Sequence, residues 1–136
     1  MRRRLVLIAA FAAVLLIPAA SAQAFTAKLK ASGHRPEAGK PWPIKVSATK
    51  NGKGIRASAF YQFLFQGQVV KTCAARPHAR NHRKCPHGKP YQFKGSYRDI
   101  LIFPKRAVGV PLTFRVVVNA KRGGTKKVSY PVRVRK

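Results

Sequence analysis

Apolar and polar residues alternate with a period of two through most of the chain after residue 24. The clearest case is the segment 126–135, in which Val128, Tyr130, Val132 and Val134 share one face. Basic and hydroxyl side chains occupy most of the positions between them. This alternation is typical of a β-strand with one face on a core and the other in solvent. No stretch keeps apolar residues at the 3.6-residue spacing of an amphipathic helix, so the pattern predicts strands.

Turns rich in glycine and proline divide these alternating segments, and their spacing predicts about seven antiparallel strands. The expected strands are Thr26–Ser32, Trp42–Lys50, Ile55–Phe65, Gln68–Cys73, Tyr91–Phe103, Leu112–Ala120 and Lys126–Arg135. Phe60 and Leu64 lie on the face of their strand that is opposite the main apolar face. This strand is therefore either covered on both sides or exposes a small apolar patch. Gly95 predicts a bulge or a close backbone approach. We expect an all-β fold: an immunoglobulin-like antiparallel β-sandwich over residues 25–136.

The N-terminus has the pattern of a signal peptide. Three arginines precede an apolar run over residues 5–17, which is too short to span a membrane as a stable helix. Small residues then predict cleavage after Ala24, or after Ala22, so residues 1–24 form the expected signal peptide. A loose twin-arginine pattern leaves the export route open, although the general secretory route is favoured. No later apolar stretch would anchor the mature chain, so it is expected to be secreted or held at the cell envelope.

The C-terminal third carries a recognisable pattern of strands and turns. It runs Phe103-Pro104, Ala107-x-Gly109-x-Pro111-Leu112-Thr113-Phe114-Arg115-Val116-Val117-Val118, Gly124-Thr125 and Tyr130-Pro131-Val132-x-Val134. It resembles the last two strands of bacterial extracellular immunoglobulin-like or fibronectin-like modules. It is also similar to small, arginine-rich secreted actinobacterial proteins of unassigned role. The resemblance covers residues 40–136 and implies a sandwich, whereas fold alone says little about function.

The charged residues of the chain exclude some classes of function. The chain has 29 Lys+Arg and 2 Asp+Glu, a formal net charge of +27, and removal of the signal peptide would leave +24. Two carboxylates, Glu37 and Asp99, are too few for an all-oxygen calcium or magnesium site, and a glycosidase would need both. Asp99 is expected to pair with a lysine or arginine, and Glu37 to lie at the surface. We expect no enzymatic activity and no cofactor.

Cys73 and Cys85 are the only cysteines, and in an exported protein they predict a disulfide. This bond would frame a basic loop over residues 74–90. Zinc is the alternative, because the segment supplies suitable donor types. Those donors are Cys73, His78, His82, Cys85 and His87. Oxidised cysteines cannot bind a metal and the neighbouring arginines would repel one, so no metal site is expected.

The same loop concentrates basic side chains that could bind anions such as phosphate. The candidates are Arg76, Arg80, Arg83 and Lys84, with His78, His82 and His87 adding charge in mild acid. The alternative is that the loop is only a solvated surface segment that binds no anion. We expect a non-enzymatic secreted binding or adhesion module whose partners are anionic polymers of the cell envelope or extracellular matrix. Teichoic-type phosphate glycans, acidic lipid headgroups and extracellular nucleic acid are the candidate partners. A cationic membrane-active protein, or a purely structural extracellular one, is the alternative.

Overall fold

The computed structural model describes residues 25–136, so the predicted signal peptide lies outside the described residues. Within this range the chain forms nine strands and one 3₁₀ helix. They are β1 (Thr26–Ala31), β2 (Pro41–Lys50), β3 (Lys53–Gly54), β4 (Arg56–Phe65), β5 (Gln68–Ala74), β6 (Tyr91–Lys94), β7 (Ser96–Ile102), η1 (Lys105–Ala107), β8 (Pro111–Ala120) and β9 (Gly124–Arg133). In the described part of the chain no helix has the length and apolar character needed to cross a membrane.

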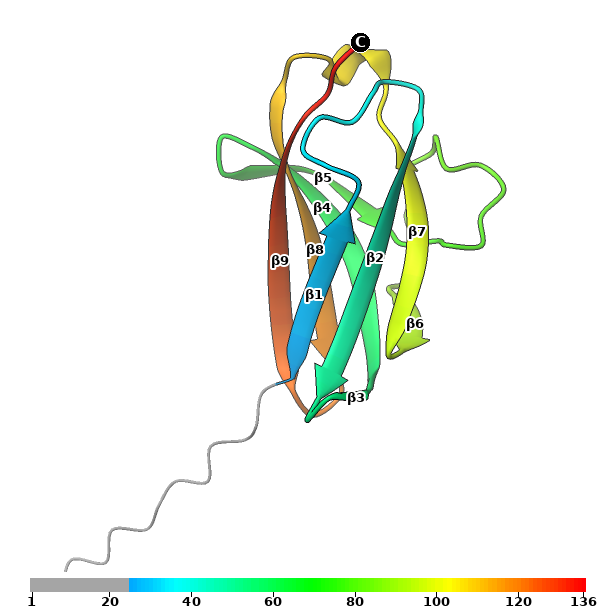
Figure 1. The fold of residues 1–136 in the computed structure, drawn as a ribbon, viewed down its shortest axis with the longest axis vertical. Coiled ribbons are helices and arrows are strands. Elements are labelled where there is room, and N and C mark those ends of the chain that lie inside the picture. Colours follow the sequence, from blue (N-terminus) through cyan, green and yellow to red (C-terminus); the bar gives the residue numbers. More distant parts are fainter. Residues whose placement is uncertain (1–24) are drawn as a thin grey trace, which may run out of the picture.

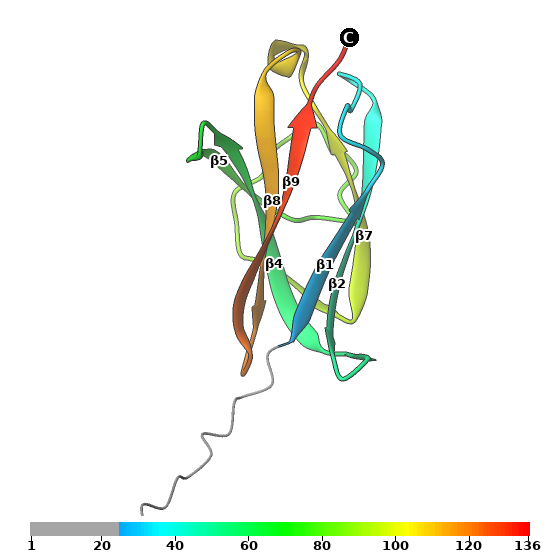
Figure 2. The ribbon, with the colours of Figure 1, turned by 60° about the vertical axis from the view of Figure 1, so that its left-hand side comes forward.

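The strands form two sheets that pack face to face (Figures 1 and 2). In the first sheet β2 is central, with β1 along one edge and β7 and β3 along the other. In the second sheet the order is β5–β4–β8–β9, and β6 shares the outer edge of β4 with β5. Every pairing between named strands is antiparallel. The expected all-β antiparallel sandwich is confirmed.

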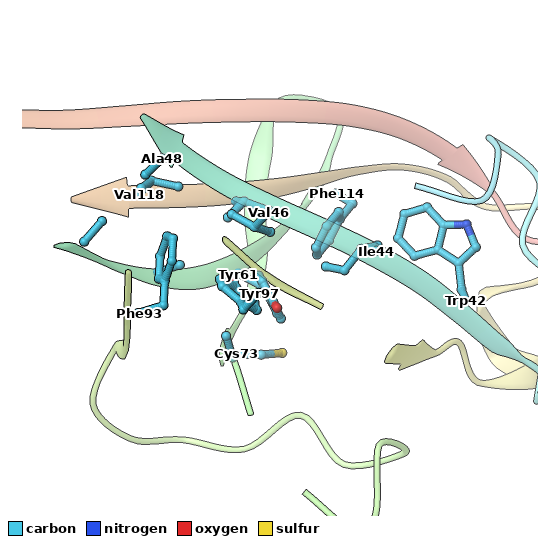
Figure 3. Packing of buried hydrophobic residues seen from close by; sticks show 14 of the residues in the cluster. Trp42, Ile44, Val46, Ala48, Tyr61, Cys73, Phe93, Tyr97, Phe114 and Val118 are labelled. Atoms are coloured by element: carbon cyan, nitrogen blue, oxygen red, sulfur yellow. The ribbon is translucent and has the colours of Figure 1, made fainter. Parts of the chain in front are cut away.

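The core lies between the sheets and follows the predicted alternation. Ile44 and Val46 point inward from β2, and Phe114 and Val118 point toward them from β8 (Figure 3). The Trp42 indole packs edge-on against the Phe114 ring, with 5.5 Å between the ring centroids. Trp42 is 3% exposed and Phe114 fully buried, so aromatic packing closes this end of the core.

The expected strand Tyr91–Phe103 is two strands, because the chain passes from one sheet to the other at Gly95. β6 pairs with β4 in the second sheet, whereas β7 pairs with β2 in the first. Gly95 has a φ of +78°, which favours glycine. A Cβ placed on Gly54 would lie 2.7 Å from the Gly95 Cα. The close backbone approach predicted at Gly95 therefore exists, and it is where the sheets are joined.

The two apolar faces of β4 are both substantially covered. Leu64 is 5% exposed on the face opposite the main core, and Phe60 is partly buried there beside its β8 partner Val117. The pairing of β4 with β5 shifts between Phe63 and Leu64, so that Val70 is an extra residue on β5. A bulge of this kind bends its strand and redirects its side chains. It leaves Val70 exposed at the edge of the sandwich.

Candidate functional site

The predicted disulfide between Cys73 and Cys85 is present, with 5.0 Å between the two Cα atoms. Beside it, the backbone N–H of Ala74 donates a hydrogen bond to the carbonyl of Pro86 at 2.8 Å. The loop thus leaves β5 and returns to the same edge of the second sheet. Between these points it extends beside β7 (Figure 1). The covalent bond and the backbone hydrogen bond together hold the two ends of the basic loop side by side.

Contacts inside the loop give it a defined path. The Asn81 Oδ1 accepts a hydrogen bond from the Arg83 N–H at 2.9 Å, which forms an Asx-type turn. The Arg76 guanidinium donates to the carbonyl of His87 at 3.1 Å, across the two sides of the loop. The N–H of Ala79 donates to the carbonyl of Arg76 at 3.0 Å. The loop is therefore tied to itself as well as to the disulfide.

The three histidines of the loop take separate positions. The Nε2 of His78 lies 3.4 Å from the hydroxyl of Tyr91, and His87 is exposed. His82 turns inward, with its Nδ1 3.6 Å from Oδ1 of Asp99 and its side chain only 20% exposed. Among residues 25–136 no group of three histidine, cysteine or acidic side chains is placed to hold a metal ion. The zinc donor set considered from the sequence is not assembled.

Asp99 is the one buried charged residue of the described chain, at 6% exposure. Its Oδ2 accepts a hydrogen bond from the Tyr61 hydroxyl at 2.7 Å, and its Oδ1 accepts one from the Ile100 N–H at 2.7 Å. The expected pairing with a lysine or arginine is wrong. Asp99 faces inward from β7 while the adjacent Arg98 faces solvent, so the carboxylate meets Tyr61 and His82 instead.

A second tyrosine lies close to this carboxylate. The hydroxyl of Tyr97 is buried and has no hydrogen-bond partner among the described residues. Burial is the main reason that the pKa values of Tyr61 and Tyr97 are raised above the ordinary tyrosine value, and the negative charge of Asp99 raises both further. Both hydroxyls therefore stay protonated in the folded protein well above neutral pH.

Replacing Tyr61 or Tyr97 by phenylalanine should change the stability of the protein differently. Tyr61→Phe leaves Oδ2 of Asp99 without a donor and is expected to lower the free energy of unfolding by about 1–3 kcal/mol. Tyr97→Phe removes an unpartnered buried hydroxyl and is expected to be neutral or stabilising. Urea unfolding at pH 7 measures both changes. Equal destabilisation by the two variants would contradict the hydrogen-bond assignment.

A cavity of about 320 Å³ lies between the loop, the edge strands β5 and β7 and the η1 segment. Its interior is formed by largely buried side chains, mainly Phe63, Leu101, Phe103 and Leu112. The polar side chains among them are Tyr61, His82 and Asp99. Its mouth is surrounded by five exposed cations, which are Lys71, Arg76, Arg83, Lys84 and Arg106. The site is an apolar cavity with a cationic rim.

Of the seven anion-binding candidates, the structure brings Arg76, Arg83, Lys84 and His82 to this cavity. Arg80, His78 and His87 do not line it. Sequence reasoning missed Lys71 and Arg106, which reach the same mouth from β5 and η1. No local signal marks them, because only the packing of the loop over β7 places them beside it.

No family model and no curated protein matches this chain. Among solved structures it is similar to a DUF4466 family protein from Parabacteroides merdae ATCC 43184, with 12% sequence identity and a TM-score of 0.45. The match covers 81% of this chain and 45% of that protein, so the chain spans less than half of its length.

Proposed function

We propose that this chain is an exported, immunoglobulin-like module that binds anionic cell-envelope polymers electrostatically and without catalysis. The observation that supports the proposal best is the convergence of basic side chains at the cavity mouth. They come from β5, the disulfide-framed loop and η1, and are Lys71, Arg76, Arg83, Lys84 and Arg106. Phosphate-bearing polymers suit such a surface, because arginine binds phosphate oxygens in a bidentate manner and lysine adds charge.

Neither acidic residue lies among the cations of the rim, so the positive charge there is not offset. Glu37 pairs with Arg135, with 3.0 Å between Nη2 and Oε2, at the C-terminal end of the chain. Asp99 is buried and already accepts hydrogen bonds from Tyr61 and a backbone N–H. The disulfide also holds the loop in place, so that less conformational entropy is lost on binding than with a free tail.

The side chains of the cavity favour binding over catalysis. The His82–Asp99 pair has the composition of a base and its orienting carboxylate. In the described part of the chain, however, no serine or threonine lines the cavity, and its two cysteines are joined to each other. The described lining therefore offers neither a hydroxyl nucleophile from serine or threonine nor a free thiol beside this pair.

Export and the immunoglobulin-like assignment are the remaining parts of the proposal. The disulfide supports an oxidising compartment outside the cytoplasm. The antiparallel sandwich and the length of residues 25–136 support the immunoglobulin-like class.

Neutralising four cations of the cavity rim should weaken retention on an immobilised poly(glycerol phosphate) column. The test variant carries Arg76→Gln, Arg83→Gln, Lys84→Gln and Arg106→Gln, all at residues that line the cavity. If all four cations contact phosphate, the slope of log affinity against log salt concentration should fall by about four. Elution at graded salt concentrations measures this slope.

A matched variant removes the same numbers of arginines and lysines from exposed positions elsewhere. It carries Arg56→Gln, Lys121→Gln, Arg122→Gln and Arg133→Gln. We expect it to change the slope much less. Equal losses in the two variants would show that binding is spread over the whole surface. An unchanged slope in the rim variant would overturn the proposal.

A further inference from the structure

The apolar interior of the cavity has no role in binding a polymer by charge. In the described residues the exposed large hydrophobic side chains are Val69, Val70 and Ile100, and the last two line this cavity. Val70 is the extra residue at the β5 bulge, and it is 58% exposed. The exposed apolar surface of the edge strands is therefore continuous with the apolar interior.

A simple anion would contact the cations of the rim and leave the interior walls unused. Phe63 and Leu112 line these walls from the second sheet, and Leu101 and Phe103 from the β7 side. A ligand that complements both parts must carry an anionic group joined to a hydrocarbon chain. We propose that the cavity binds a single-chain anionic amphiphile, with its chain inside and its carboxylate or phosphate group at the basic rim.

Asp99 fixes the orientation of this ligand. Its carboxylate is at the inner wall and is already hydrogen-bonded by Tyr61, so it would repel a second negative charge placed beside it. The exposed cations at the mouth, including Arg83 and Arg106, attract that charge instead. The carboxylate therefore lies at the inner wall beside His82, and the exposed positive charges lie at the rim.

The volume limits the size of the chain. About 320 Å³ lies at the lower end of the range for small-molecule pockets. This volume suits one hydrocarbon chain. The ligand is therefore a single amphiphile molecule that binds from solution, and the cavity does not bind the surface of an intact bilayer.

A chain-length series tests the proposal by isothermal titration calorimetry with the full mature chain. The probes are n-alkanoates and n-alkyl phosphates of four to twelve carbons, used below their micelle concentrations. Burial of a methylene group predicts that affinity rises about fourfold for each added carbon until the cavity is full. The two head groups distinguish a carboxylate from a phosphate ligand, and n-alkanols of the same lengths should bind more weakly than both.

Two matched substitutions on β5 locate the binding. Val70→Asp places a negative charge at the mouth and should weaken decanoate binding at least tenfold. Val69→Asp adds the same charge at a neighbouring exposed residue that does not line the cavity, and should change it less than threefold. Both variants should retain the melting temperature of the parent, because both side chains are exposed.

Three outcomes would overturn the inference. The first is an affinity that does not depend on chain length and matches that of inorganic phosphate, which would restrict binding to the rim. The second is equal weakening by the two valine variants. The third is binding to anionic diacyl vesicles in the absence of binding to the monomeric probes. None of these depends on retention by poly(glycerol phosphate), so this inference and the proposed polymer binding can fail separately.

Discussion

Replacing both Cys73 and Cys85 with alanine is expected to lower the free energy of unfolding by about 3 kcal/mol. The bond joins residues 12 apart in sequence, and closing a loop of this length restricts the unfolded chain by about that amount. Cys73 is 5% exposed at the end of β5, so alanine replaces it without adding a polar group to the core. Urea unfolding of the oxidised parent and the double variant measures the difference.

The same variant should release one wall of the cavity. Without the disulfide, the loop is held only by the hydrogen bond between Ala74 and Pro86 and by its internal hydrogen bonds. These bonds open more easily than a covalent bond. Trypsin should then cleave after Arg80 and Arg83 faster than in the oxidised protein, under conditions where the sandwich stays folded. The reduced parent is the control. Equal stability and equal cleavage with and without the bond would show that non-covalent contacts alone hold the loop.

Alkaline pH should destabilise the protein through its two buried tyrosines. The pKa values of Tyr61 and Tyr97 are raised in the folded state, mainly by burial. Below pH about 10, the ordinary tyrosine pKa, both states keep these protons and the stabilisation is complete. Above it the unfolded chain releases protons that the native state retains, so stability falls as the pH rises. The loss should reach about 1.4 kcal/mol per pH unit for each tyrosine, or about 2.8 kcal/mol per pH unit for both.

Urea unfolding at several pH values between 9 and 11.5 measures this slope. The Tyr61→Phe/Tyr97→Phe double variant should begin less stable than the parent but lose stability more slowly above pH 10. Comparison of the two slopes removes the contribution of the lysines, which titrate in the same range. Parallel pH curves for parent and double variant would contradict the assignment.

The strand pattern of the sequence was sufficient to predict the antiparallel sandwich, because the buried positions follow the alternation of apolar and polar residues. The inward positions of β2, such as Ile44 and Val46, are buried as expected. The passage of the chain between sheets at Gly95 was not predicted. A glycine within an alternating segment indicates an irregularity, but it does not show which sheet each half joins. That choice depends on the partners β2 and β4, which are distant in sequence.

The cavity and its residues were only partly predictable from the sequence, because they also depend on contacts between distant segments. The basic loop and its disulfide are local in sequence, so spacing and composition could identify them. The inward turn of His82 and the partners of Asp99 depend on packing between the loop, β7 and β4. Lys71 and Arg106 reach the cavity in the same way, from elements without a motif. Sequence patterns locate charge along the chain, whereas these contacts depend on the tertiary arrangement.

The placement of β5 and β6 along one edge of β4 has a consequence for how this protein could diversify. The loop leaves and re-enters the same sheet edge, and its ends are held 5.0 Å apart by the disulfide. The entropic cost of a longer connection grows slowly, by about 0.6 kcal/mol for each doubling of loop length. Residues between the cysteines can therefore be exchanged or extended without altering strand pairing. The sandwich can therefore carry loops of different sequence and length at one position.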